Sequence, residues 1–317
     1  MILKILKWSG IIIGSILLLV TITVAMRQNL KFEAPYPEIS ATTDSAVIAR
    51  GKEIVIGPAH CASCHSLQNA DSLLNLGKEP VMSGGFEFSF ELGSFYSRNI
   101  TPDKETGIGR YTDPEIARVL RYGVRPNGAA MLDFMPFHNV SDEDLTAIIS
   151  YLRHQPAVKN KVPEHDYTLM GKVIKAFLIK PVGPSEEVPK KVKRDSTAAY
   201  GKYLALNVAN CNGCHTERDM TGGFIGEPFS GGGPMTEPGK DTLTPPNLTP
   251  HPESRIYTWS QQDFINRVRM GKLIEHSHMP WNSYKRMSDD DLKAIYKYLR
   301  ILKPAKTGEL LPEHSKG

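Results

Sequence analysis

Four cysteines give the sequence its most specific chemical signal, because all of them lie in two copies of one short pattern. The copies read CASCH at residues 61–65 and CNGCH at residues 211–215. A Cys-x-x-Cys-His run is the attachment site of a c-type haem, in which both thiols bond to the porphyrin and the histidine becomes an iron ligand. We therefore predict two covalently bound haem c groups, held by Cys61, Cys64, His65, Cys211, Cys214 and His215.

Two other uses of paired cysteines fit the pattern less well. A thioredoxin-like redox pair does not require a histidine directly after its second cysteine. A four-cysteine zinc site usually brings its two pairs within about 15–20 residues of each other. Here most of a domain separates the pairs, so the repeated pentad favours haem attachment.

Each iron needs a second axial ligand, and we predict Met135 and Met279 in this role. Each methionine is followed by a proline and an aromatic residue. Proline fixes the local backbone, and a thioether ligand stabilises ferrous iron and raises the reduction potential. Because a lone methionine is more often a core residue, several alternatives stay open: Met131 in the first half, Met270 and Met287 in the second, and bis-histidine ligation through His138, His276 or His278.

Further residues are expected to orient the two histidines or to contact the porphyrins. A backbone carbonyl within residues 245–247 would orient His215 by accepting a hydrogen bond from its Nδ1–H. Residues 98–99 stand at the matching place in the first half. Tyr111 and Trp259 also match each other and could pack on a porphyrin or reach a propionate.

The whole unit around each pentad is repeated, which indicates a tandem duplication. The offset between matched residues lies between 144 (Met135 to Met279) and 150 (Cys61 to Cys211). Matched Ser/Thr and Glu/Asp pairs predict N-capped helices in both halves. These pairs are Thr112 with Glu115, Ser260 with Asp263, and the starts of SDEDLTAIISYLR at Ser141 and SDDDLKAIYKYLR at Ser288.

The N-terminal segment predicts a membrane-spanning helix. Residues 8–26 contain no charge, and 19 residues at about 1.5 Å each match a hydrocarbon core of roughly 30 Å. Lys4 and Lys7 precede this stretch and favour a cytoplasmic N-terminus with the remainder exported. A cleaved signal peptide, with Thr23 and Ala25 at a poor cleavage site, is the competing interpretation.

Composition and segment boundaries complete the prediction. The 317 residues have ordinary globular composition and a formal charge of +4, from which we expect no nucleic-acid partner.

The stretch at 167–180 predicts a short amphipathic helix. It could lie on an anionic membrane surface or on a partner subunit. We favour a third interpretation, a linker helix packed across both domains. We expect a disordered tail. The predicted segments are an anchor (1–30), a tether (31–44), a first haem domain (45–155), a linker with a short amphipathic helix (156–195), a second haem domain (196–303) and a tail (304–317).

Further motifs resemble those of class I cytochrome c domains. They are NITPD at 99–103, TGIG at 106–109, and the Met-Pro-aromatic loop that precedes Ser-Asp-x-Asp-Leu in each half. The pattern is similar to the cytochrome c subunits of membrane-bound alcohol, aldehyde and gluconate dehydrogenases over residues 45–155 and 195–303. The resemblance implies a mainly α-helical fold with His/Met haems. Those subunits typically carry three haem motifs, whereas this sequence carries two.

The expected function is electron transfer, not catalysis on a substrate. We expect a single-pass protein of the cytoplasmic membrane whose haem domains lie in the periplasm. A dehydrogenase or quinol-oxidising complex would be its donor, and a cytochrome or terminal oxidase would be its acceptor. The alternative from another class is a dihaem enzyme of the peroxidase or thiosulfate-oxidising type. A haem-based sensor would need an output domain that the sequence does not contain.

Overall fold

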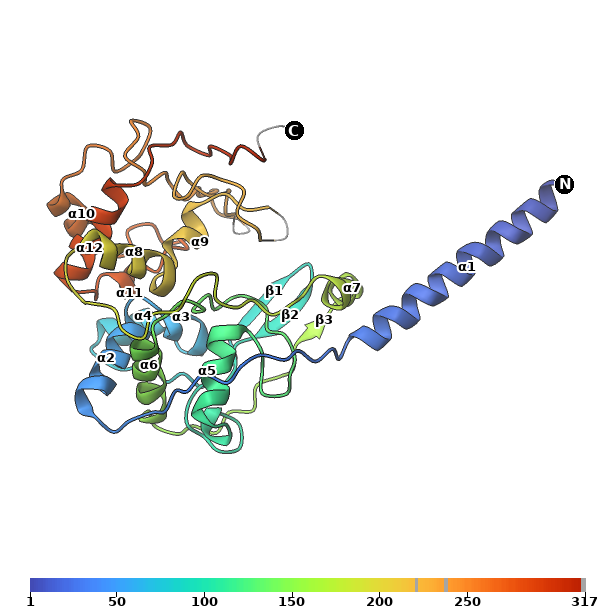
Figure 1. Ribbon diagram of the computed structural model, residues 1–317, viewed down its shortest axis with the longest axis horizontal. Coiled ribbons are helices and arrows are strands. Elements are labelled where there is room, and N and C mark those ends of the chain that lie inside the picture. The colour runs from blue at the N-terminus through green and yellow to red at the C-terminus, as the bar shows by residue number, and fades with distance from the viewer. Residues whose placement is uncertain (220–221, 237–238, 315–317) are drawn as a thin grey trace.

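Two helical units and one projecting helix make up the computed structural model, which describes residues 1–219, 222–236 and 239–314 (Figure 1). The projecting helix is α1 (Ile2–Arg27). The first unit contains α2 (Ser45–Ile56), α3 (Cys61–His65), α4 (Ala70–Asn75), the 3-10 turn η1 (Ile108–Arg110), α5 (Asp113–Tyr122) and α6 (Asp142–Arg153). The second contains α8 (Ala198–Tyr203), the π-helical turn η2 (Leu204–Val208), α9 (Cys211–His215), α10 (Gln261–Arg269), α11 (Trp281–Tyr284) and α12 (Asp289–Arg300).

Helix α1 extends away from both units, and none of its residues is buried (Figure 1). It has a mean hydropathy of 2.3. Among the described residues it is the one helix long and apolar enough to cross a membrane. Helix α1 therefore contains the whole uncharged stretch at 8–26 and begins before it, so that Lys4 and Lys7 are also helical.

The capping pairs predicted from the sequence are confirmed. Thr112 and Glu115 form a reciprocal capping box at the start of α5, and Ser260 with Asp263 forms the same arrangement at α10. Ser288 caps α12 in the same way, and Ser141 accepts a hydrogen bond at the start of α6. These side chains satisfy backbone N–H groups that the first helical turn leaves without partners.

A small antiparallel sheet in the first unit was not predicted. Its strands are β1 (Glu87–Phe90), β2 (Gly93–Tyr96) and β3 (Asp166–Tyr167), in the order β1-β2-β3. Phe88 and Phe90 alternate along the first strand, and Phe86 directly precedes it. The rings of Phe88 and Phe134 stack with centroids 5.6 Å apart. This aromatic cluster covers the loop that leads to Met135.

In each unit the first helix crosses the last one at a glycine. A Cβ atom on Gly51 of α2 would lie 1.9 Å from the Ala147 carbonyl oxygen of α6. A Cβ atom on Gly201 of α8 would lie equally close, at 1.9 Å, to the Ala294 carbonyl oxygen of α12. Any side chain at these positions would therefore separate the two helices.

Extended segments after the last helix of each unit pack back onto that unit. The Asn99 amide donates to the Val158 carbonyl at 2.8 Å, and the Asn247 amide donates to the Ala305 carbonyl at 2.7 Å. The prediction of a disordered tail is therefore wrong for residues 304–314. This segment packs on the second unit in the way that the segment around Val158 packs on the first. Residues 315–317 of the predicted tail lie outside the described residues.

The predicted tether also lies against the first unit. Ile39 is buried, and the Ala41 N–H donates to the Asp113 carboxylate at 2.7 Å. The Phe32 N–H donates to the Gly128 carbonyl at 2.8 Å. Residues 31–44 are thus extended and are held against the first unit by hydrogen bonds and by the buried Ile39.

A buried ion pair within the first unit is linked to the second unit by a tyrosine hydroxyl. Arg50 of α2 donates to Asp144 of α6 at 2.9 and 3.1 Å. The Tyr203 hydroxyl of α8 donates to the same carboxylate at 2.8 Å, and burial raises the pKa of Tyr203, with the Asp144 charge adding to the shift. Removing either charged partner would leave an uncompensated charge between the units.

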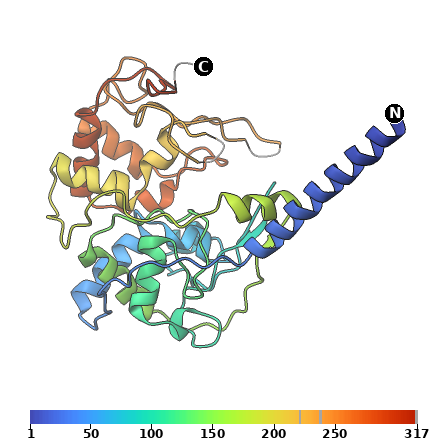
Figure 2. The ribbon, with the colours of Figure 1, turned by 45° about the vertical axis from the view of Figure 1, so that its right-hand side comes forward.

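The amphipathic stretch at 167–180 forms α7 (Leu169–Phe177), but α7 does not pack across the two units as we favoured. Instead it contacts the C-terminal end of α1 and the tip of the β1–β2 hairpin (Figures 1 and 2). A Cβ atom on Gly171 would lie 2.0 Å from the Leu92 carbonyl oxygen. The close approach to the hairpin therefore depends on glycine.

Gly201→Ala should destabilise the second unit by about 1–3 kcal/mol, because the added methyl group collides with backbone and forces α8 away from α12. Chemical denaturation of the haem-loaded protein, followed by circular dichroism, measures the loss. Lys202→Ala is the control, since Lys202 is the exposed next residue of the same helix. Equal stability of both variants would contradict the role of this crossing.

Candidate haem sites

In the first unit α3 carries the CASCH run and places His65 in the interior. His60 begins the helix with φ 39°, a left-handed conformation, and His65 is 8% exposed. Its Nδ1–H donates to the Arg98 carbonyl at 2.7 Å, the region anticipated from the sequence. Burial lowers the pKa of His65, so the ring is neutral and its Nε2 lone pair is free to bind a metal.

The second unit repeats this arrangement on α9. Asn210 begins the helix with φ 49°, and His215 is 7% exposed. The His215 Nδ1–H donates to the Pro246 carbonyl at 2.8 Å, which confirms the predicted carbonyl within residues 245–247. Burial again lowers the pKa of the histidine. Both imidazoles are thus oriented by backbone from a separate loop.

The four cysteines form no disulfide, and each pair precedes its histidine in the chain. Burial, with a smaller contribution from the second cysteine of each pair, raises the pKa of Cys61 and of Cys211 to about 12. Within the described ranges, no three His, Cys, Asp or Glu side chains gather to hold a metal ion by themselves. The pairs are therefore not arranged as a four-cysteine zinc site.

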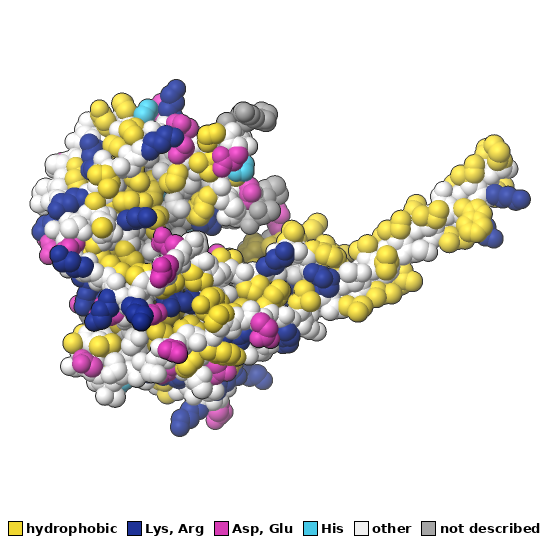
Figure 3. Space-filling model, in the orientation of Figure 1, with side chains coloured by type: hydrophobic (Ala, Val, Ile, Leu, Met, Phe, Trp, Pro, Cys, Tyr) yellow, Lys and Arg dark blue, Asp and Glu magenta, His cyan; other side chains and the backbone are white. Residues whose placement is uncertain are grey.

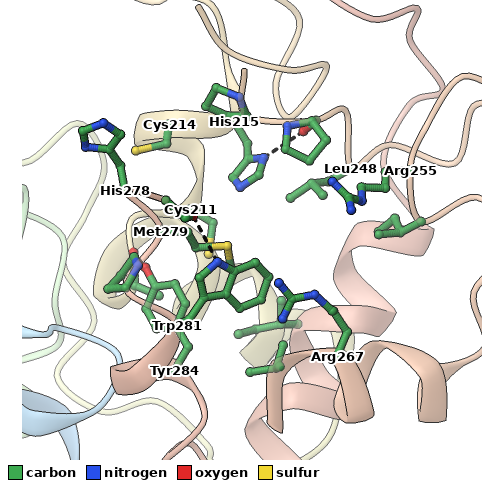
Figure 4. Close-up of a pocket in the computed structure, with 18 of the residues that line it drawn as sticks. Cys211, Cys214, His215, Leu248, Arg255, Arg267, His278, Met279, Trp281 and Tyr284 are labelled. Atoms are coloured by element: carbon green, nitrogen blue, oxygen red, sulfur yellow. Dashed lines mark hydrogen bonds between the residues drawn. The ribbon is translucent and has the colours of Figure 1, made fainter. Parts of the chain in front are cut away.

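A cavity in the second unit brings the predicted groups together. Cys211, Cys214, His215 and Met279 all line it, and Figure 4 shows Cys211, His215 and Met279 around the same space. Most of the remaining wall is apolar or aromatic, and the predicted contact residue Trp259 belongs to it. The cavity thus offers thiols, an imidazole and a thioether within an apolar enclosure, which is the donor set that a haem c group requires.

Two arginines of this wall were missed by the sequence analysis. Arg255 and Arg267 line the cavity, and the part of the chain that the structure describes contributes no Asp or Glu to the lining. The Arg267 guanidinium lies 3.6 Å from the Trp281 ring centroid, and its pKa is lowered by burial and then by Arg255. Positive charge without a carboxylate partner suits the propionates of a haem. Nothing in the local sequence distinguishes these arginines, because their convergence arises from the fold.

The alternative ligands of the second half are placed differently from one another. Met270 is 62% exposed and is absent from the cavity wall. Met287 is buried and lines the cavity, as does His278. His276 is not part of the wall. The structure therefore separates Met279 from Met270 but keeps Met287 and His278 near the site.

In the first half the structure argues against one of the alternatives, His138. Met135 is half-buried and packs against the core, whereas Met131 is 8% exposed. His138 uses both ring nitrogens within the protein, with Nδ1 3.0 Å from the Arg121 carbonyl and Nε2 2.9 Å from the Asp133 carboxylate. Because neither nitrogen is free, His138 is a poor candidate for the iron.

Positive charge also gathers beside the first histidine's loop. Arg125 Nη2 lies 2.8 Å from His165 Nε2. The pKa of His165 is lowered to about 3, mainly by burial and then by Arg125, Arg98 and Lys175. His165 is therefore neutral, and the surrounding cations give this side of the unit a positive potential that fits an anionic group. The predicted contact Tyr111 lies beneath the Arg110 guanidinium, 4.8 Å from its ring centroid.

Comparisons with known proteins agree with this geometry. The family model described as Cytochrome c matches residues 48–156, and that described as Cytochrome C oxidase, cbb3-type, subunit III matches residues 198–299. Each half of this chain is a cytochrome c domain, so the predicted mainly helical fold with two such domains is confirmed.

Similar whole chains point in the same direction. The cytochrome c subunit of a quinone-dependent alcohol dehydrogenase from Gluconobacter oxydans is 31% identical over 84% of this chain and 57% of its own length. The gluconate 2-dehydrogenase cytochrome c subunit of Pantoea cypripedii is 29% identical over 82% and 60%. A diheme cytochrome c-type protein of Cereibacter sphaeroides is 26% identical over 76% and 81%. The chain thus spans somewhat more than half the length of the dehydrogenase subunits that it matches.

These findings establish the cofactor. Two cytochrome c domains and the similarity to a dihaem protein support two covalently bound haem c groups, as predicted. The chain is similar to proteins named as cytochrome c subunits of dehydrogenases.

Replacing Cys211 and Cys214 by serine should reduce the covalent haem content from two groups to one, because serine does not form thioether bonds. Intact-protein mass spectrometry and haem staining after denaturing electrophoresis measure the content. The Cys61/Cys64 double variant is the matched control and should lose the other haem. Two haems in either variant would refute the assignment of that pentad.

Arg267→Gln should lower the potential of one haem by on the order of tens of millivolts, since removing a nearby cation stabilises the ferric state. A spectroelectrochemical titration of the full protein measures both potentials. Arg300→Gln removes the same charge from the same unit outside the cavity wall and should leave both nearly unchanged. An unchanged potential in Arg267→Gln would place this arginine away from the haem.

Proposed function

We propose that this chain is a membrane-anchored dihaem cytochrome c that relays single electrons outside the cytoplasmic membrane. It would accept them from a dehydrogenase or quinol-oxidising complex and deliver them to a downstream cytochrome or oxidase. The observation that carries the proposal is the cavity in which His215 and Met279 face the same enclosed apolar space beside a thiol pair. Two protein ligands would leave the iron no position for a reactant.

The site residues follow from this arrangement. We propose that His65 and Met135 bind one iron and that His215 and Met279 bind the other. The thioether bonds would be made by Cys61, Cys64, Cys211 and Cys214. The domains that carry them are proposed to span residues 45–155 and 196–303, each completed by the extended segment that follows it.

The residues of the chain tune these sites in three ways. The Arg98 and Pro246 carbonyls hold the two imidazoles in the tautomer whose Nε2 is free, and they make the rings better donors. The Met135 and Met279 thioethers, as the second ligands, would favour the reduced state of a bound haem. The apolar wall of the second site would exclude water and so keep solvent rearrangement small during electron transfer.

One side chain supports exchange between the two haem sites. Tyr284 is buried, and its ring meets that of His60, the residue before Cys61, edge to face with centroids 5.9 Å apart. Its hydroxyl donates to the Ala209 carbonyl at 2.7 Å, two residues before Cys211. A single aromatic residue therefore contacts the chain just before both haem-binding helices, which supports electron exchange between the two sites as part of the proposal.

The partner and the location rest on broader evidence. Helix α1 is apolar over the length of a bilayer core, and Lys4 and Lys7 precede it, which supports an anchor with the haem units on the periplasmic side. Relatives named as cytochrome subunits of alcohol and gluconate dehydrogenases support a dehydrogenase as the donor.

Met279→Ala should abolish the weak long-wavelength absorption band of sulfur-ligated ferric haem for one of the two haems and lower that haem's potential. Met270→Ala is the control, because Met270 is exposed outside the cavity. Absorption spectra and redox titration of the full protein report both effects. Retention of the band at full intensity in Met279→Ala would transfer the role to another sulfur ligand, of which Met287 is the candidate in the cavity wall.

The donor can be identified by affinity purification of the full chain from gently solubilised membranes. We expect a dehydrogenase to co-purify and its substrate to reduce the haems in the membrane, with alcohols, gluconate and other sugar acids tested in parallel. Rapid peroxide turnover by the purified protein, with a five-coordinate iron, would instead favour a dihaem enzyme.

A further inference from the structure

Helix α7 presents its large apolar side chains outward instead of toward the protein. Leu169 is 79% exposed, Met170 is 61% exposed and Phe177 is 42% exposed. Residues 169, 173 and 177 follow one another on one helical face, and residue 170 lies beside them. The small residues Gly171 and Ala176 are the buried ones. An apolar patch of this kind on a helix indicates contact with an apolar environment on its outer side.

The position of α7 along α1 indicates which environment that is. Arg27 Nε donates to the Ala176 carbonyl at 2.7 Å, and the Gln28 amide donates to the Lys172 carbonyl at 2.9 Å. The Arg27 guanidinium also lies over the Phe177 ring, 5.4 Å from its centroid. These contacts occur directly after the uncharged stretch at 8–26 ends, so α7 lies at the level where a hydrocarbon core would give way to headgroups.

The direction of α7 fits the same level. In Figure 1 α7 is seen nearly end-on while α1 lies across the page, so their axes cross steeply, and Figure 2 shows α7 beside the end of α1. A spanning α1 would therefore leave α7 roughly parallel to the membrane surface. Figure 3 shows apolar side chains along α1 continuing onto the neighbouring part of the body, next to basic side chains.

The positive charge of the α7 segment indicates that the membrane surface it contacts is anionic. Residues 167–180 contain Lys172, Lys175 and Lys180 and no acidic residue, while the acidic residues Asp166 and Glu91 belong to the hairpin side of the helix. Basic residues that flank an apolar helical face are attracted to anionic lipid headgroups.

We propose that α7 is an interfacial helix that inserts its outer face into the anionic headgroup layer and holds the first haem unit against the membrane. The inference rests on the membrane anchor proposed for α1. Gly171 fits closely against the hairpin at Leu92, so α7 and the sheet would move together. Contact of α7 with lipid would therefore fix the orientation of the first unit relative to the membrane.

Site-specific photo-cross-linking in isolated membranes tests this placement. A benzophenone amino acid replaces Met170, Leu18 or Ile301 in separate full-length, haem-loaded proteins. These positions are comparably exposed, at 61%, 62% and 70%, but lie on α7, in the middle of α1 and on the second unit. We expect lipid adducts at positions 170 and 18 that exceed those at 301 roughly tenfold.

The outcomes separate the two proposals. Lipid adducts at 18 but not at 170 would overturn the interfacial helix and leave the anchor intact. Adducts at neither position would overturn the anchor as well. Cross-links from 170 to another polypeptide would overturn the lipid contact and identify α7 as a subunit interface.

The basic residues have their own matched test in vesicles of phosphatidylcholine with or without phosphatidylglycerol. Lys172→Gln with Lys180→Gln should lower lipid cross-linking at position 170 roughly fivefold in the anionic vesicles alone. The control removes Lys191 and Lys193, whose side chains are 78% and 88% exposed in the linker. An equal loss in both lipid mixtures, or in the control, would overturn the proposed selection of anionic lipid.

Discussion

The close crossing of the first and last helix in each unit is the constraint on which the rest depends. Gly51 and Gly201 let backbone meet backbone at these crossings. The first helix precedes the Cys/His helix, with the turn η2 between them in the second unit, and the methionine loop precedes the last helix, with the short α11 between them in the second unit. Because both ligand-bearing segments start from the same contact, the crossing sets how the imidazole side of each site lies relative to the sulfur side.

The two units share this frame but differ in what surrounds it. The first carries a sheet, an aromatic cluster on the loop before Met135, and the contacts to α1 and α7. The second carries the arginine-lined cavity. The buried Arg50–Asp144 pair with Tyr203 joins the units through the same first helices. The duplicated fold thus has one unit that contacts α1 and α7 and one that does not share these surroundings.

Prediction from sequence succeeded where a property is local and failed where it depends on distant segments. Capping pairs such as Thr112 with Glu115 act within one helical turn, so they were predicted correctly. The alternation of Phe86, Phe88 and Phe90 is also local and could have indicated the strand. The tail offered no comparable signal, because its order comes from the Asn247–Ala305 hydrogen bond between segments far apart in the chain.

The sequence by itself determined the chemistry: two thiol pairs, each followed by a histidine, specify covalent haem because the groups lie within five residues of one another. Tertiary structure alone decided which other residues serve those groups. Arg255 and Arg267 line one cavity, and α7 presents its apolar face outward. Both ring nitrogens of His138 have protein partners, so His138 is a poor iron ligand. Each of these facts depends on which surfaces pack together, and packing brings together residues that no spacing along the chain relates.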